Sequence, residues 1–223
     1  MSGQHTSRPT LHYIFDPLCG WCYGAGPLIE AARKVNGLDI ALHAGGLMTG
    51  SDRQPVTERL RRYVMEHDQR ISALTGQPFG DAYLNGLLRD TGAVLDSEPP
   101  IGAILAAELL GGRGLDMLER IQKAHYVEGR RVADRGVLVG LAADLGLPEA
   151  TFKPMLEKVT GLTAAKHIAA SRALLKRVGG QGFPTFVFDA GRWLETLDTA
   201  RHFGRVPVWQ QTLAEHMSGS TSD

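Results

Sequence analysis

The order of apolar and polar residues predicts strands near both ends of the chain. Leu11–Phe15 is a short run rich in β-branched and aromatic residues, and Leu38–Leu42 alternates between apolar and polar side chains, so both stretches predict strands. Thr185–Phe188 and Trp193–Leu194 predict two more strands, joined by a turn at Asp189–Arg192. The predicted strands therefore come from opposite ends of the sequence.

Helical patterns fill the chain between these strands. From about Ser51 onward, apolar residues recur at the spacing of helices. Pro154 makes the stretch 152–159 ambiguous, because a proline inside a helix removes a hydrogen-bond donor. Met1–Thr10 and Ser218–Asp223 are expected to be loose. We expect helices over Ala25–Val35, Val56–Leu74, Phe79–Leu88, Ile101–Leu109, Leu115–Val127, Asp134–Leu145, Thr163–Val178 and Pro207–His216.

Composition and charge exclude some classes of function. Apolar residues make up 43% of the chain and charged residues 22%, which is ordinary for a globular protein. The 24 basic side chains equal the 24 acidic ones, and this balance argues against a nucleic-acid partner, which needs a basic excess on some face. No window is apolar enough for a transmembrane helix, and the polar start of the chain lacks the apolar core of a signal peptide. We therefore expect a cytoplasmic protein with no membrane partner.

The candidate chemistry lies in Asp16–Gly24, which holds the two cysteines of the sequence, Cys19 and Cys22. A predicted strand precedes them and a predicted helix follows. Cys19 therefore stands at a helix N-terminus, where unpaired backbone N–H groups and the helix dipole favour a thiolate over a thiol. We expect Cys19 to be the nucleophile. Cys22, on the same helical face, would be the more buried thiol and would resolve a mixed disulfide by attacking the Cys19 sulfur.

Three other interpretations of the cysteine pair compete with this one. A zinc site would need further ligands from the eight histidines, none of which forms a pair with the usual zinc spacing, so we expect no metal. Two unreactive core cysteines are common in general, but the placement between a strand and a helix disfavours them. A structural disulfide that closes so small a loop would stabilise the fold little.

A second motif lies far from the cysteines, in Gly179–Phe188, and contains Phe183 and Pro184. Together with the Cys-x-x-Cys motif, it resembles the thioredoxin superfamily, in which a cis-proline just before a strand faces the active-site disulfide. Pro27 is a further match, because thioredoxin-like helices carry a kinking proline at this offset from the second cysteine. The resemblance implies a cis peptide bond between Phe183 and Pro184 and a substrate chain bound by the backbone of Phe183.

The long separation between the two motifs leaves room for a helical domain inserted into the thioredoxin fold. This arrangement is similar to the DsbA-like group, particularly its FrnE-type branch. The resemblance implies an α/β protein with a thioredoxin fold and an inserted α-helical domain. Residues 1–48 and 163–223 would form the thioredoxin-like core, and residues 49–162 would form the insertion.

The sequence departs from the family at one position. Thioredoxin and many DsbA-like proteins have a buried acid six residues before the first cysteine, which assists proton transfer at the second, but Tyr13 stands here. Asp16 is a candidate for that proton transfer, or it caps the turn that leads into the helix. Trp21 offers an aromatic surface to a substrate, or it packs as a loop tryptophan. Because Gly20 and Trp21 carry no charge, we expect a disulfide less oxidising than that of DsbA itself.

These observations predict a thiol-disulfide oxidoreductase that acts on protein or small-molecule thiols and disulfides. The residues expected to act are Cys19 and Cys22 in exchange and Trp21, Phe183 and Pro184 in substrate binding. We expect no bound cofactor, and glutathione is a candidate redox partner. Two alternatives remain. One is a glutathione-dependent isomerase or transferase resembling the kappa-type branch, which typically has serine in place of Cys19. The other is a polypeptide-binding protein with an idle redox pair.

Overall fold

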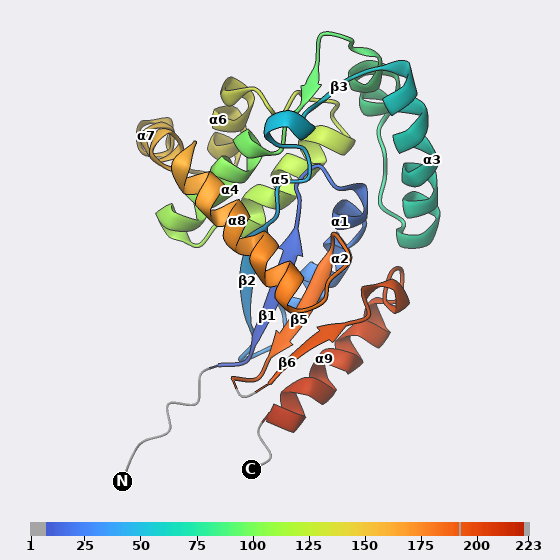
Figure 1. Cartoon of the computed structure of the whole chain (residues 1–223), viewed down its shortest axis with the longest axis vertical. Coiled ribbons are helices and arrows are strands. Elements are labelled where there is room, and N and C mark those ends of the chain that lie inside the picture. The colour runs from blue at the N-terminus through green and yellow to red at the C-terminus, as the bar shows by residue number, and fades with distance from the viewer. Residues whose placement is uncertain (1–7, 192, 221–223) are drawn as a thin grey trace.

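A four-stranded sheet lies at the centre of the molecule (Figure 1), whose computed structural model describes residues 8–191 and 193–220. The strands are ordered β2-β1-β5-β6. β1 pairs in parallel with β2 and antiparallel with β5, and β5 pairs antiparallel with β6. The predicted hairpin of β5 and β6 is confirmed, although Arg192 in its turn lies outside the described residues. The strands are β1 (Thr10–Phe15), β2 (Asp39–Ala44), β5 (Thr185–Asp189) and β6 (Leu194–Leu197).

Helices cover the sheet and fill the chain between β2 and β5, so the predicted α/β fold class is confirmed (Figure 1). Four helices pack around the sheet: α1 (Gly20–Gly24), α2 (Gly26–Ala32), α8 (Leu162–Arg177) and α9 (Val206–Ser220). The remaining long helices are α3 (Glu58–Thr75), α4 (Glu98–Gly111), α5 (Gly114–Tyr126), α6 (Arg135–Asp144) and α7 (Glu149–Val159). The short elements are η1 (Gly50–Asp52), β3 (Gln54–Pro55), the π-helical turn η2 (Ala82–Gly86), η3 (Leu87–Arg89), β4 (Val94–Leu95) and η4 (Thr199–Arg201). None of the described helices is both long enough and apolar enough to cross a membrane.

The side chains of β1 alternate between the two faces of the sheet, because successive residues of a strand point to opposite sides. Ile14 packs with Val187 of β5 and Leu174 of α8 on one face. On the other face the ring of Tyr13 stacks on Phe186 of β5, with 4.9 Å between ring centroids. Both sides of β1 are therefore buried, and this burial fixes the strand that leads into Cys19.

Helices α2 and α9 cover the Tyr13 face of the sheet. The fully buried ring of Trp209 in α9 lies 5.1 Å from that of Phe186, and its Nε1–H donates to the carbonyl of Leu28 in α2 at 2.9 Å. This single side chain therefore joins the sheet to both helices. Its hydrogen bond fixes the position of α2, the helix that follows the cysteines.

Several local predictions need correction. The predicted helix over Phe79–Leu88 is wrong, because the chain forms the π-helical and 3-10 turns of η2 and η3 there. A Cβ atom on Gly80 would lie 2.1 Å from the carbonyl oxygen of Val127, so the close contact with the end of α5 shapes this segment. Residues 218–220 are not loose but continue α9, while residues 221–223 lie outside the described residues. The ambiguous stretch around Pro154 is helical in α7.

Candidate active site

The cysteine pair lies where β1 leads into α1. Cys19 is the N-cap residue of α1, and its Sγ accepts a hydrogen bond from the backbone N–H of Cys22 at 3.4 Å. Both cysteines are free thiols in this structure. Cys19 is 7% exposed and Cys22 is fully buried, so the prediction that Cys22 is the more buried thiol is confirmed. Burial, reinforced by the neighbouring Cys19 thiol, raises the pKa of Cys22 well above its ordinary value.

The predicted cis-proline loop faces the first cysteine. The peptide bond between Phe183 and Pro184 is cis, as the resemblance implies. The Cys19 thiol donates to the carbonyl oxygen of Phe183 at 3.5 Å. The ring of Phe183 lies so close to Gly45 that a Cβ atom there would be 2.2 Å from its Cζ. Arg172 of α8 donates to the carbonyl oxygen of Gly45 at 2.7 Å, which holds the segment after β2 against α8.

The carboxylate of Asp16 ties together the segments around the cysteines. It is fully buried and accepts hydrogen bonds from Leu18 N at 2.8 Å, Leu47 N at 2.6 Å and Ser97 Oγ at 2.9 Å. Burial raises its pKa to about 6, against the lowering effect of these donors. The bond to Leu18 N supports the capping interpretation. The backbone N–H of Asp16 also donates to Cys22 Sγ at 3.5 Å, and its role in proton transfer stays a prediction.

Tyr13 and Trp21 flank the pair. The hydroxyl of Tyr13 donates to the carbonyl oxygen of Cys22 at 3.2 Å. Burial raises the pKa of Tyr13 well above its ordinary value, so the phenol stays neutral and does not replace the missing acid as a base. Trp21 is half-buried, with its ring 5.1 Å from that of Phe203. Its contact with a substrate stays a prediction.

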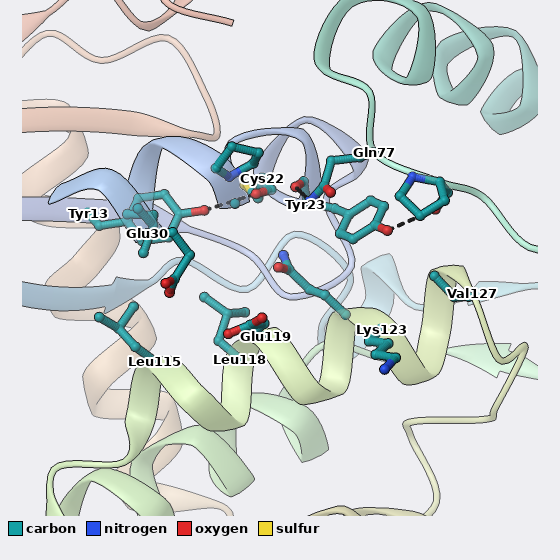
Figure 2. A pocket seen from close by; sticks show the side chains of 15 residues that line it. Tyr13, Cys22, Tyr23, Glu30, Gln77, Leu115, Leu118, Glu119, Lys123 and Val127 are labelled. Carbon is teal, nitrogen blue, oxygen red and sulfur yellow. Dashed lines mark hydrogen bonds between the residues drawn. The ribbon is translucent and has the colours of Figure 1, made fainter. Parts of the chain in front are cut away.

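A cavity of about 340 Å³ adjoins the buried cysteine, between α1–α2 and α5, and its wall includes Cys22 itself. Figure 2 shows Tyr23 and Glu30 facing Leu118 and Glu119 of α5 across this space. Most of its lining is apolar, and Glu30 and Glu119 are among the polar residues that line it. The second cysteine, which is closed off from solvent, therefore borders a space between the sheet helices and the helices that follow β2.

One buried acid near the cysteines, Asp68 of α3, was not predicted from the sequence. This residue is 4% exposed, and its Oδ2 accepts a hydrogen bond from the hydroxyl of Tyr83 at 3.0 Å. Burial raises its pKa to about 7, although the bond from Tyr83 opposes that rise. A signal was present in the sequence. Asp68 stands at the position where the apolar stripe of α3 should continue between Val64 and Ile71.

Comparisons with known proteins agree with this geometry. The model of the family described as DSBA-like thioredoxin domain matches residues 10–203. The cytosolic disulfide reductase DsbM from Pseudomonas aeruginosa is 54% identical, with 94% of this chain and 98% of that chain covered and a TM-score of 0.89. The structure of DsbM with GSH, also 54% identical, covers 94% and 99% with a TM-score of 0.88. A 2-hydroxychromene-2-carboxylate isomerase shares the fold at 15% identity, with 96% and 100% covered and a TM-score of 0.59. No curated protein sequence matches the chain significantly.

Proposed function

Since the chain belongs to the DsbA-like thioredoxin family and is a thiol-disulfide oxidoreductase, we propose that it works as a cytoplasmic disulfide reductase with glutathione as its redox partner. The likeness to DsbM, and the structure of that protein with GSH, support the direction and the partner. Residues 49–162 would be the insertion that distinguishes this chain from a minimal thioredoxin fold.

The proposed reaction passes two electrons from the Cys19–Cys22 pair to a substrate disulfide. The Cys19 thiolate attacks one substrate sulfur, which forms a mixed disulfide and releases the other sulfur as a thiol. Cys22 then loses its proton, for which Asp16 is the candidate acceptor, and attacks the Cys19 sulfur to release the second thiol. Two molecules of glutathione return the enzyme to the dithiol and leave as glutathione disulfide.

One observation carries the proposal: Cys19 caps α1 with its sulfur 3.5 Å from the carbonyl of Phe183, while Cys22 is buried behind it. An incoming sulfur therefore meets Cys19 first, beside the backbone of Phe183 and the ring of Pro184. Trp21 would supply an apolar contact at the same edge.

The lack of charged side chains between the two cysteines favours a reductant. A disulfide becomes strongly oxidising when the protein stabilises the reduced form, chiefly as a thiolate. Here Gly20 and Trp21 place no charge between the cysteines, and burial disfavours the thiolate of Cys22. The expected potential lies near those of glutaredoxins and thioredoxin, about −200 to −270 mV.

The test is the redox equilibrium of Cys19 and Cys22 in glutathione buffers, followed by alkylation and mass spectrometry. We expect one reversible two-electron couple in the range above, and we expect Cys22→Ser to trap a mixed disulfide on Cys19. Cys19→Ser is the matched control and should trap none. A potential near −120 mV would instead indicate an oxidant. Failure to form an internal disulfide in any buffer would reject redox exchange and favour a glutathione-dependent isomerase or transferase.

A further inference from the structure

Helix α3 lies directly on the cysteine-bearing helix α1 (Figure 1). Two glycines make this close approach possible. A Cβ atom on Gly20 would lie 3.0 Å from Ile71 Cδ1 and 3.1 Å from Asp68 Oδ1, and one on Gly24 would lie 2.8 Å from Ile71 Cγ2. Asp68 and Ile71 are three residues apart and therefore share one face of α3. The contact brings the carboxyl of Asp68 to Gly20, the residue that follows Cys19.

Only half of the Asp68 carboxyl is engaged. Oδ2 accepts the hydrogen bond from Tyr83, whereas no group in the described part of the chain donates to Oδ1, the oxygen nearest Gly20. The titratable groups that face Asp68 are Tyr83 from η2 and Tyr126 from α5, and from α1 it is Gly20, next to Cys19, that lies against the carboxyl. Burial is the largest effect that raises the pKa of Tyr83 and Tyr126 well above ordinary values, so both phenols stay neutral. Of these three side chains, Asp68 is therefore the one that exchanges a proton near pH 7.

We propose that Asp68 is the general acid that protonates the substrate sulfur expelled when Cys19 attacks. The inference rests on the proposed disulfide exchange at Cys19. In this step the Cys19 thiolate forms a bond to one substrate sulfur, the substrate S–S bond breaks with its electron pair on the second sulfur, and the proton of Asp68 moves to that sulfur. The products are the mixed disulfide, a free thiol and the Asp68 carboxylate, which regains a proton from solvent.

The environment of Asp68 suits this role. An exposed carboxylic acid is ionised at neutral pH and has no proton to give, whereas the pKa of Asp68 is about 7. An ordinary thiol has a pKa near 8.5, so transfer from Asp68 to a departing thiolate runs downhill. Asp16 differs, because both oxygens of its carboxylate accept hydrogen bonds, from Leu18, Leu47 and Ser97. Asp68 would thus act in the step at Cys19, and Asp16 in the step at Cys22.

The test compares two uncharged disulfides that differ in their leaving group. Bis(2-hydroxyethyl) disulfide expels a basic thiolate whose sulfur needs a proton. 4,4′-Dithiodipyridine expels a delocalised thiolate that needs no proton on sulfur and becomes the thione by taking one from solvent on its ring nitrogen. Rate constants for mixed-disulfide formation would be measured in a Cys22→Ser background, where the first step is isolated. The variants are Asp68→Asn, Tyr83→Phe and, as the matched control, Glu66→Gln on the exposed side of the same helix.

We expect Asp68→Asn to slow the reaction with bis(2-hydroxyethyl) disulfide by about 100-fold or more and that with dithiodipyridine by less than about 2-fold. Glu66→Gln should change neither. The Tyr83 bond lowers the pKa of Asp68, so Tyr83→Phe should move the decline in the first rate to higher pH. Equal slowing of both reactions by Asp68→Asn, or an unmoved pH profile in Tyr83→Phe, would overturn the inference. If the parent reacts with neither disulfide, the proposed exchange itself fails.

Discussion

Replacing Asp68 by asparagine should change how the stability of the protein depends on pH. The free energy of unfolding of the variant, relative to that of the wild type, should be higher at pH 8 than at pH 4.5. Burial raises the pKa of Asp68 from 3.8 to about 7 in the folded protein, while the unfolded chain keeps the ordinary value. The folded state therefore holds the proton more tightly than the unfolded state. It follows that the wild type loses stability as the pH rises from about 4 to about 7, and no more above that.

The size of this loss follows from the two values. The difference between 3.8 and about 7, at about 1.4 kcal/mol per pKa unit, corresponds to about 4 kcal/mol in total. About 3 kcal/mol of it falls between pH 4.5 and pH 8. Asparagine cannot ionise, and its carbonyl oxygen can still accept the hydrogen bond from Tyr83. The variant should therefore lack this part of the pH dependence.

The assay is urea-induced unfolding of both proteins at pH 4.5, 6 and 8 under reducing conditions. The quantity of interest is the difference in unfolding free energy between Asp68→Asn and wild type, because other titrating groups cancel in it. Glu66→Gln, on the exposed side of α3, serves as the control and should show no such trend. A difference for Asp68→Asn that stays constant from pH 4.5 to pH 8 would refute the reasoning.

Three further predictions concern the frame around the site. Trp209→Phe removes the hydrogen bond to α2 and should lower the unfolding free energy by about 1–3 kcal/mol in urea titrations. Gly80→Ala places a Cβ 2.1 Å from a backbone oxygen and should cost about 2 kcal/mol or more, whereas Gly136→Ala in α6 meets open space and should gain up to about 1 kcal/mol by the same assay. Ser97→Ala removes a donor that lowers the pKa of Asp16, so its carboxyl should titrate above about 6 in carbon-13 NMR.

The cysteine motif was predictable because it depends on a short stretch of sequence, and the cis-proline was predictable because the two motifs together resemble the thioredoxin superfamily. The strand before Cys19 follows from a few side chains of Leu11–Phe15, and the helix N-terminus follows from the apolar spacing after Cys22. Where a bend at Pro27 was predicted, the chain instead has a break just before it, and this too has a local cause. Helix α1 ends at Gly24, and α2 begins at Gly26 with Pro27 in its first turn, where the missing N–H costs no hydrogen bond.

The parts that were not predictable depend on contacts between distant segments. The apolar residues after Phe79 have helical spacing, but the contact of Gly80 with the end of α5 decides the local shape. The two-residue strands β3 and β4 are too short to leave a pattern. Leu74 fits the predicted apolar stripe of α3, yet it is 48% exposed. The side of α3 that packs against α1 carries Ile71 and Thr75 instead. The importance of Asp68 likewise emerges only when α3 is placed on α1.

The pairing of β1 with β5 has a consequence for the synthesis of the chain on the ribosome. Cys19 and Cys22 are made early, whereas Phe183 and β5 follow about 160 residues later. At about 5–20 residues per second, the ribosome needs roughly 10–30 s to add that length. During this interval the nascent chain carries both thiols without the carbonyl that faces Cys19 in the finished protein. A message truncated between Cys22 and β5 would therefore yield a chain with both thiols but without the carbonyl of Phe183 that faces Cys19.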